Sequence, residues 1–239
     1  VAGLDHPGVV HVFDYGEVDM RAENGSLGRL VAGSPFLAME VADGGSLRTR
    51  PTPSTWAQLR GILAWLLDVL AHAHARNVIH RDIKPGNVMI TQNGQVKVMD
   101  FGIARAISDS SATIAQTSAI LGTAQYFSPE QARGEAVDAR TDLYSTGVVL
   151  YEMLTGQAPF RAEGAVAVAY QHVSEAPVPP NTLNSAISPA LSAVVLRALA
   201  KDRFERYQSA ADFRADLEIA LAGKVPDAAP ASDDFGAAL

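Results

Sequence analysis

The hydrophobic and polar positions near the start of the chain predict two β-strands joined by a loop. Residues 9–18 (VVHVFDYGEV) and 35–42 (PFLAMEVA) are apolar runs with partial alternation, which is typical of half-buried strands. Residues 21–34 between them are polar and carry glycines, so we expect an irregular loop there.

A long amphipathic helix and a tight hairpin come next in the pattern. From residue 54 to residue 77, apolar side chains recur on one helical face. Farther along, the short apolar runs 88–91 and 96–99 flank Asn93-Gly94, a pair that strongly favours a tight hairpin turn. We therefore expect two short antiparallel strands there.

The second half of the chain predicts a helical body. Apolar periodicity predicts further helices at residues 141–155, 164–173, 189–200 and 209–222. Thr141 and Ser188 are candidate N-caps, and Gly156 and Gly223 follow the ends of two of these helices. Residues 103–122 are rich in Ser, Thr and Ala without clear periodicity, so we expect a mobile loop.

Composition narrows the class of protein. The chain has 239 residues, of which 48% are hydrophobic and 19% charged, which is typical of a globular protein with a sizeable core. A net charge of −7 argues against a nucleic-acid surface, and the absence of cysteine excludes disulfides and thiolate metal sites. No apolar run is long enough to span a bilayer, and no signal peptide opens the sequence. Because residue 1 is Val, we expect an excerpt of a longer protein.

Charged and amide side chains cluster in three short motifs that follow one another along the chain. The first motif, in NVIHRDIKPGNVMI, contains His80, Arg81, Asp82, Lys84 and Asn87. The second is DFG at 100–102, directly after the predicted hairpin, and the third is SPE at 128–130. A single acidic residue after a helix is usually a cap, and a lone DFG occurs by chance. Chance does not explain all three motifs in this order.

Together these motifs resemble the catalytic domain of bacterial Ser/Thr protein kinases of the actinobacterial, Hanks-type group. The segments VKVMDFGIARAI, GTAQYFSPEQARG and VDARTDLYSTGVVLYEMLTG are similar to that group. The resemblance implies an α+β, protein-kinase-like fold with a mostly helical C-lobe and only the last part of the β-rich N-lobe. The implied division is a partial N-lobe at 1–40, the hinge and C-lobe with catalytic and activation loops at 41–222, and a disordered tail at 223–239.

The resemblance also implies phosphoryl transfer from ATP, a reaction that depends mainly on positioning and charge neutralisation. Asp82 is the implied base that orients the substrate hydroxyl and accepts its proton. Lys84 is implied to neutralise the transferred phosphate. Asn87 and Asp100 are implied to hold Mg²⁺ or Mn²⁺ through hard oxygen ligands.

ATP-binding residues are implied by the same resemblance. Met39 would guard the back of the pocket, although plain core packing explains it equally well. The implied adenine and ribose contacts are the backbone of Glu40, Val41 and Ala42, the carboxylate of Asp43 and the side chain of Met89. Asp100 joins this set through the metal ion.

Another set of residues is implied to be structural rather than reactive. Its members are His80, Arg81, Phe101, Gly102, Glu130, Asp142 and Arg206. His80 is expected to be buried against Phe101 rather than to act as a general base. Asp142 is expected to accept hydrogen bonds from the catalytic-loop backbone, and Glu130 to form a buried ion pair with Arg206.

The substrate loop and the catalytic loop both resemble those of kinases that phosphorylate Ser and Thr. The Gly122-Thr123 pair precedes a tyrosine, and Thr123 is expected to hydrogen-bond Asp82. Arg81 beside Asp82 implies an activation loop that becomes ordered when it is phosphorylated. The candidate phosphate acceptors are Thr117 first, then Thr113 and Ser118.

Several parts of a working kinase do not occur in this sequence. No G-x-G-x-x-G motif precedes Met39 and no lysine precedes Lys84, so the phosphate-covering loop and the strand lysine are absent. The helix glutamate that pairs with this lysine is also absent. We therefore expect a Ser/Thr protein kinase domain whose residues 1–239 alone are inactive or nearly so. A pseudokinase or docking module is the alternative, and a small-molecule phosphotransferase is a third reading, disfavoured by GTAQYFSPEQ.

The implied partner is a protein substrate with a Ser or Thr hydroxyl. We expect no nucleic acid partner and no membrane contact from this segment. A kinase dimer in the full-length protein stays open. The implied location is the cytoplasm, and a downstream membrane anchor of the full-length protein also stays open.

Overall fold

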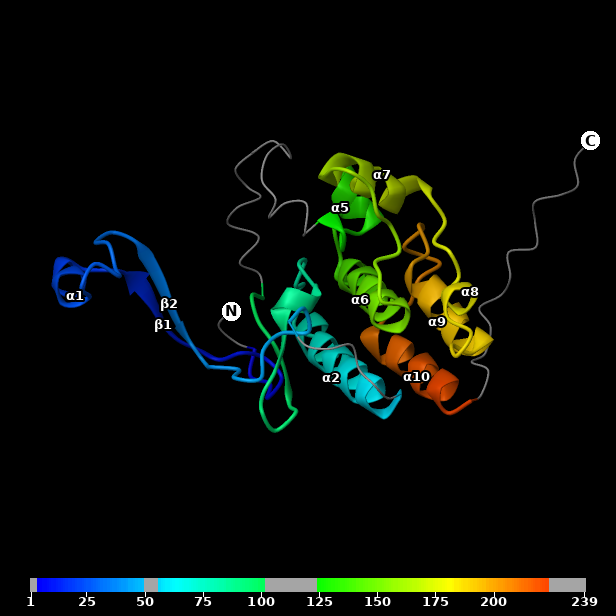
Figure 1. Ribbon diagram of the computed structural model, residues 1–239, viewed down its shortest axis with the longest axis horizontal. Coiled ribbons are helices and arrows are strands. Elements are labelled where there is room, and N and C mark those ends of the chain that lie inside the picture. The colour runs from blue at the N-terminus through cyan, green and yellow to red at the C-terminus, as the bar shows by residue number, and fades with distance from the viewer. Residues whose placement is uncertain (1–3, 50–55, 102–123, 224–239) are drawn as a thin grey trace, which may run out of the picture.

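The structure is a computed structural model that describes residues 4–49, 56–101 and 124–223. Within these residues the chain is mainly helical and contains two separate two-stranded antiparallel sheets. Figure 1 shows the helices that follow the first sheet gathered in one body, from which that sheet extends as an arm. The predicted α+β class is therefore confirmed. The predicted loop 103–122 and the predicted tail after Gly223 lie outside the described residues.

The elements follow the order expected from the sequence, with additions. The arm contains β1 (Val12–Glu17), α1 (Met20–Gly25) and β2 (Pro35–Met39). The second sheet consists of β3 (Val88–Ile90) and β4 (Val96–Val98), and the 3₁₀ turn η1 (Pro85–Asn87) precedes it. The helices of the body are α2 (Trp56–His74), α5 (Pro129–Arg133), α6 (Ala139–Thr155), α7 (Ala165–Ser174), α8 (Pro180–Leu183), α9 (Pro189–Ala198) and α10 (Ala210–Leu221).

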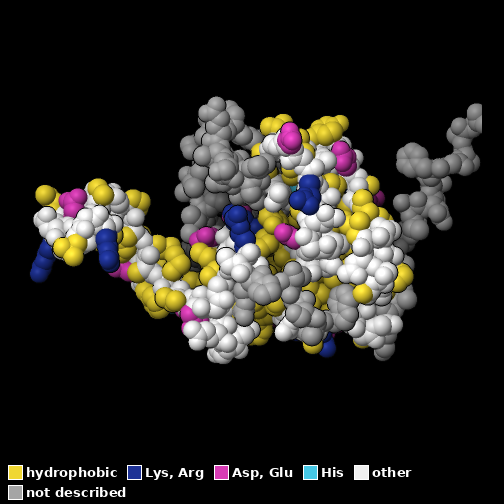
Figure 2. All heavy atoms as spheres, viewed as in Figure 1, with side chains coloured by type: hydrophobic (Ala, Val, Ile, Leu, Met, Phe, Trp, Pro, Cys, Tyr) yellow, Lys and Arg dark blue, Asp and Glu magenta, His cyan; other side chains and the backbone are white. Residues whose placement is uncertain are grey.

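The arm is a hairpin in which β1 and β2 pair antiparallel, with Tyr15 opposite Leu37. Its side chains are poorly covered, because Phe13 is 67% exposed and Tyr15 is 79% exposed. Figure 2 shows hydrophobic side chains along this arm and at its junction with the body. Two strands alone cannot bury an apolar face, so the arm depends on further contacts for stability.

Helix α1 corrects the prediction of an irregular loop over residues 21–34. Asp19 precedes the helix and its carboxylate accepts a hydrogen bond from the backbone N–H of Ala22. Ser26 ends the helix, and its backbone N–H donates to the carbonyl of Glu23. None of the six helical residues is buried, so the sequence has no apolar periodicity from which this helix could be predicted. The helix is stabilised by its N-cap instead.

The second sheet is the predicted hairpin, and the chain pairs with it on both sides. Gly94 has φ +84°, a left-handed conformation that glycine adopts without steric cost. Val98 of β4 accepts a hydrogen bond from the N–H of Val10, at 2.9 Å. On the other side, the N–H of Leu47 donates to the carbonyl of Val88, also at 2.9 Å. These pairings connect the segments before and after the arm to the region that follows η1.

The core of the body lies between α2, α6, α9 and α10. Helix α10 packs along α2, as Figure 1 shows, and α9 packs against α6. The predicted apolar face of α2 is confirmed, because Leu63, Leu66 and Leu70 have no exposed surface. Each such leucine contributes on the order of 1.5–3 kcal/mol through the hydrophobic effect. Helix α6 is buried over almost its whole length, so it acts as a central support.

Several helix ends agree with the sequence and one start does not. Ser188 caps α9 by accepting from the N–H of Leu191, and Gly156 ends α6 with φ +76°. The prediction that Thr141 is the N-cap is wrong, because α6 begins earlier, directly after Asp138. The carboxylate of Asp138 accepts from the N–H of Arg140 at 2.9 Å, which places Thr141 inside the first turn. Helices α5 and α8 are short and have no counterpart in the predicted elements.

Candidate active site

The first motif forms a loop between α2 and η1 that contains an unusual backbone conformation. Arg81 has φ +70°, and Asp100 after β4 has φ +66°. Left-handed conformations are uncommon for residues other than glycine, and the surrounding structure must hold them in place. The backbone at both residues is therefore held by its surroundings.

Two side chains of the first motif converge on the carboxylate of Asp82. The Nζ atom of Lys84 lies 2.7 Å from Asp82 Oδ2. The Nδ2 atom of Asn87 donates to the same oxygen at 3.0 Å and to the Asp82 carbonyl at 2.8 Å. About a quarter of the Asp82 and Lys84 side chains is exposed, with 23% and 25%. The arrangement places an acid and a cation together on an accessible surface.

Asp100 reaches this region through the second sheet. The backbone N–H of Met99, which precedes it, donates to the carbonyl of Asn87 at 3.0 Å. Asp100 also lines a pocket between β2 and β4, together with Met39, Met99 and Phe101. The three polar residues Asp82, Asn87 and Asp100 therefore belong to loops that are joined by main-chain pairing.

Asn87 and Asp100 have the chemistry that a hard divalent cation requires. The amide nitrogen of Asn87 faces Asp82, so its oxygen is the atom that can face a cation. One carboxylate and one amide oxygen form a partial shell, as in Mg²⁺ sites that are completed by phosphate and water. Among the described residues, no group of three or more His, Cys, Asp or Glu side chains could hold a metal by itself.

His80 and Asp142 fix the backbone of this loop. His80 is fully buried, and its ring centroid lies 4.6 Å from that of Phe101. Asp142 accepts from the N–H of His80 at 2.9 Å and from the N–H of Arg81 at 2.7 Å. Both contacts were expected from the sequence. His74 was not, yet its Nε2 lies 2.7 Å from Asp142 Oδ2 and donates to it.

The ring of His80 uses both of its nitrogen atoms. Nε2 donates to the carbonyl of Met99 at 2.8 Å, and Nδ1 accepts from the N–H of Asp82 at 3.2 Å. Because Nδ1 acts as an acceptor, it carries no proton in this arrangement. Both ring nitrogens of His80 thus contact backbone groups, so the ring supports the loop and we assign it no role in proton transfer.

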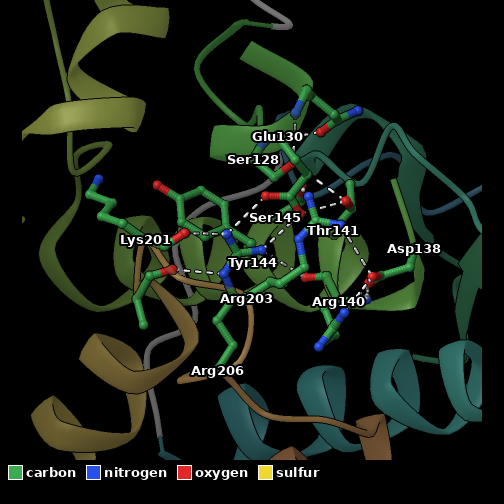
Figure 3. Close-up of polar contacts among 12 residues, drawn as sticks. Ser128, Glu130, Asp138, Arg140, Thr141, Tyr144, Ser145, Lys201, Arg203 and Arg206 are labelled. Carbon is green, nitrogen blue, oxygen red and sulfur yellow. Dashed lines mark hydrogen bonds and ion pairs between the residues drawn. The ribbon is translucent and has the colours of Figure 1, made fainter. Parts of the chain in front are cut away.

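Glu130 and Arg206 form a buried ion pair, and Figure 3 draws both side chains among the polar contacts around them. The guanidinium donates twice to the carboxylate, at 2.8 and 2.9 Å, and Thr141 donates to it at 2.7 Å. Burial raises the pKa of Glu130, but the hydrogen bonds from Arg206 and Thr141 outweigh it and lower this pKa to about 2. The pair joins α5 to the segment before α10.

The residues expected to contact a nucleotide lie where β2 runs into the following segment. Met39 ends β2, and the N–H of Glu40 donates to the carbonyl of His11 at 2.8 Å. The carboxylate of Asp43 accepts from the N–H of Gln92 at 3.0 Å, which turns it toward the β3–β4 turn. Val41 is 80% exposed.

Of the other predicted site residues, some lie within the described residues and some do not. Met89 lies on β3 and forms a bridge with Ser46, while Ala42 precedes the turn at Asp43. The residues predicted on the activation loop, and the last residue of the DFG motif, lie outside the described residues: Gly102, Thr113, Thr117, Ser118 and Thr123. The predicted contact of Thr123 with Asp82 therefore stays a prediction.

Comparison with known proteins places these observations in a family. The sequence profile of the protein kinase domain matches residues 1–214. The serine/threonine-protein kinase PknB of Mycolicibacterium smegmatis is 50% identical over 230 residues, which cover 95% of this chain and 35% of that protein.

Other actinobacterial kinases match to a similar degree. PknB of Mycobacterium tuberculosis (strain ATCC 25618 / H37Rv) is 49% identical over 230 residues, with the same coverages of 95% and 35%. A probable serine/threonine-protein kinase of Streptomyces coelicolor is 48% identical over 229 residues, which cover 93% of this chain and 32% of that protein. The chain thus spans about a third of the length of the curated relatives that it matches. On this basis, the chain belongs to the protein kinase domain family.

Proposed function

We propose that this chain is the catalytic part of an ATP-dependent Ser/Thr protein kinase that transfers the γ-phosphate to a Ser or Thr hydroxyl of a protein substrate. The observation that carries the proposal is the convergence of Lys84 and Asn87 on one oxygen of Asp82, at 2.7 and 3.0 Å. The loop that contains these residues is joined to the residue before Asp100, because the N–H of Met99 donates to the carbonyl of Asn87.

The proposed reaction follows from the positions of these side chains. The substrate oxygen bonds to the γ-phosphorus while the bond from that phosphorus to the bridging oxygen of ADP breaks. Asp82 orients the hydroxyl and takes its proton, and Lys84 offsets the negative charge on the transferred group. A bound Mg²⁺ or Mn²⁺ ion would neutralise part of the negative charge of the phosphates. Asn87 and Asp100 are the residues that would hold this ion.

The same proposal assigns the rest of the site and the domains. The backbone from Glu40 to Ala42 would bind adenine, Asp43 the ribose, and Met39 and Met89 would lie behind and beneath the base. For Asp43 this requires release of the Gln92 N–H or a contact through its second oxygen. The proposed boundaries are a partial N-lobe at 1–40, the hinge and C-lobe at 41–222, and a tail at 223–239.

We further propose that residues 1–239 by themselves transfer phosphate slowly or not at all. They contain no glycine-rich motif before Met39 and no lysine before Lys84. Without these groups the triphosphate would be held from one side only, and positioning supplies most of the rate in this chemistry. A docking module without transfer is the second candidate; the presence of Asp82, Asn87 and Asp100 together argues against it, because a scaffold needs none of the three.

The location and partners of the protein are part of the proposal. Among the described residues, no helix combines the length and hydrophobicity that crossing a bilayer requires. We propose that this segment acts in the cytoplasm on a protein substrate, and that the activation-loop acceptor is Thr117, with Thr113 and Ser118 as the next candidates.

The test uses the complete gene product that contains these residues, with radiolabelled ATP and a Ser/Thr peptide library. Asp82→Asn should lower kcat by about 10²–10⁴-fold, the range that general-base groups contribute. Asp68→Asn is the matched control, because Asp68 pairs with His6 and Arg214 on the surface of α2. Nucleotide binding without any transfer by the unaltered protein would establish the docking module instead. Equal rates for residues 1–239 and the complete product would refute the proposed inactivity.

A further inference from the structure

The peptide group between Arg81 and Asp82 is held at both of its polar atoms. The Arg81 carbonyl accepts a hydrogen bond from Nε2 of Gln131 at 2.7 Å. The N–H of Asp82, in the same peptide group, donates to Nδ1 of His80 at 3.2 Å. Because φ of Arg81 is +70°, this peptide has an orientation that the residue would not adopt without such restraints. The orientation of this peptide determines the direction in which the Asp82 side chain leaves the backbone.

Gln131 is itself fixed by the start of helix α5. Its side-chain Oε1 accepts from the N–H of Ser128 at 3.0 Å, and its own N–H donates to the Ser128 hydroxyl at 3.3 Å. These two contacts form a capping box, which satisfies two backbone donors at the helix start. The amide therefore uses its oxygen for the helix and its nitrogen for the catalytic loop.

Helix α5 in turn is anchored in the body by its second residue. Glu130 is 1% exposed and pairs with Arg206, as described above. The donor offered to Arg81 is consequently attached to a rigid support rather than to a mobile surface side chain. This chain of contacts runs from Arg206 through Glu130 and Gln131 to the peptide before Asp82.

We propose that Gln131 is a positioning residue for phosphoryl transfer, which holds the Arg81–Asp82 peptide in its left-handed geometry and thereby aims the Asp82 carboxylate. The inference rests on the proposed kinase function. Without the Nε2 donor the Arg81 carbonyl loses its partner, and the strained peptide is free to rotate. Rotation would turn Asp82 away from the geometry set by Lys84 and Asn87, which lowers kcat without removing any group that contacts nucleotide.

Gln131→Glu separates the two roles of the side chain. A glutamate keeps the oxygen that accepts from Ser128 but has no N–H to donate to Arg81, whereas Gln131→Ala loses both contacts. Asn184→Asp is the matched control for the change in charge and in donors. The Asn184 amide also donates from Nδ2 to a backbone carbonyl, that of Leu154, at 3.2 Å, and its Oδ1 accepts from the N–H of Ala186 at 3.0 Å. Asn184 lies at the end of α8, outside the chain of contacts from Arg206 to Arg81.

The variants are compared in the complete gene product by steady-state kinetics and by hydrogen exchange of the peptide that covers residues 78–84. For Gln131→Glu we expect kcat to fall about tenfold or more, while KM for ATP changes by less than about twofold. The amide of Asp82 should exchange about tenfold faster, since a hydrogen bond is lost next to it. Asn184→Asp should change neither kcat nor this exchange rate.

Two outcomes would overturn the inference. One is a Gln131→Glu variant with unaltered kcat and unaltered exchange at Asp82. The other is a loss of kcat in Gln131→Ala alone, with Gln131→Glu unaffected, which would assign Gln131 only to capping of α5. If the unaltered protein transfers no phosphate, the proposed kinase function fails, and the exchange data still decide whether Gln131 holds the peptide.

Discussion

Glu40 and Lys97 form an ion pair between the end of the arm and the centre of β4, with Oε1 2.6 Å from Nζ. The other carboxylate oxygen of Glu40 accepts from the N–H of His11 at 3.2 Å. The hydrogen bond from Lys97 lowers the pKa of Glu40 from its ordinary value. One carboxylate thus connects the start of β1, the end of β2 and the second sheet, at the place where we propose that adenine binds.

The two members of this pair should differ in the cost of their removal. The Lys97 side chain is 9% exposed and that of Glu40 is 30% exposed. Glu40→Met leaves a cation that is shielded from water, whereas Lys97→Met leaves a carboxylate that water can reach. We expect Glu40→Met to lower the free energy of unfolding by about 2–4 kcal/mol and Lys97→Met by about 1 kcal/mol. Urea unfolding of both variants at neutral pH measures the difference, and equal losses would contradict the role of burial.

His172 predicts a loss of stability in mild acid. It is fully buried on α7, where its Nδ1 accepts from the Tyr144 hydroxyl at 2.9 Å and its Nε2 donates to the Gln125 carbonyl at 3.0 Å. Burial and the nearby Lys201 ammonium lower the pKa of His172 from 6.5 to about 4. The unfolded chain therefore takes up a proton at a higher pH than the folded chain does. The stability that His172 contributes is complete above its ordinary pKa and is lost as the pH falls toward about 4.

Substitution of His172 should remove this part of the pH dependence. Over its window His172 accounts for about 3 kcal/mol of the change in the free energy of unfolding. His172→Gln keeps one donor and one acceptor, so its free energy of unfolding should change less with pH in the same window. The measurement is urea unfolding at several pH values with the m-value held constant. The explanation is wrong if both proteins lose stability in parallel.

The Glu130–Arg206 pair should behave as a coupled unit. Arg206→Met leaves the buried Glu130 carboxylate without its cation, so we expect a loss of about 3–5 kcal/mol. Adding Glu130→Gln to that variant removes the charge, and the double variant should be more stable than the sum of the two single losses predicts. A double-mutant cycle by thermal or urea unfolding gives the coupling free energy, and a value near zero would show that the two side chains act separately.

Two glycines offer a contrasting pair of alanine substitutions. A Cβ at Gly44 would collide with the Ile90 carbonyl oxygen and lie 2.8 Å from that of Thr91, so the backbone would have to move. Gly61 on α2 has nothing within 4 Å of its Cβ position. We expect Gly44→Ala to destabilise the protein by about 1–3 kcal/mol and Gly61→Ala to stabilise it by about 0.5–1 kcal/mol. Differential scanning calorimetry checks both signs, and a stabilised Gly44→Ala variant would contradict the close approach.

Elements with local signals in the sequence were predicted well. Ser188 and Pro189 mark the start of α9, Gly156 marks the end of α6, and Asn93-Gly94 marks the hairpin. Each of these residues determines the conformation of its own backbone or of the adjacent turn, so its effect can be predicted without knowledge of tertiary contacts. Helix α5 was missed even though Ser128 and Gln131 have the spacing of a capping box.

The errors have a common origin in short elements and competing caps. Helix α1 buries no side chain, so its sequence shows no apolar period, and only Asp19 indicates its start. Thr141 has a side chain typical of an N-cap, but Asp138 precedes it in the chain and is the residue that caps α6. The Thr141 hydroxyl instead donates to Glu130, a contact that depends on how α5 packs against α6.

The sequence by itself determined the family resemblance, the order of the elements and the grouping of Asp82, Lys84 and Asn87 in one short segment, because these are properties of neighbouring positions along the chain. Only the tertiary structure decided the contact of His74 with Asp142 and that of Gln131 with Arg81, since these partners lie 68 and 50 residues apart along the chain. Many polar side chains could satisfy these groups. The packing of α2, α5 and α6 selects one of them, because a buried donor or acceptor must find its partner within a few ångströms.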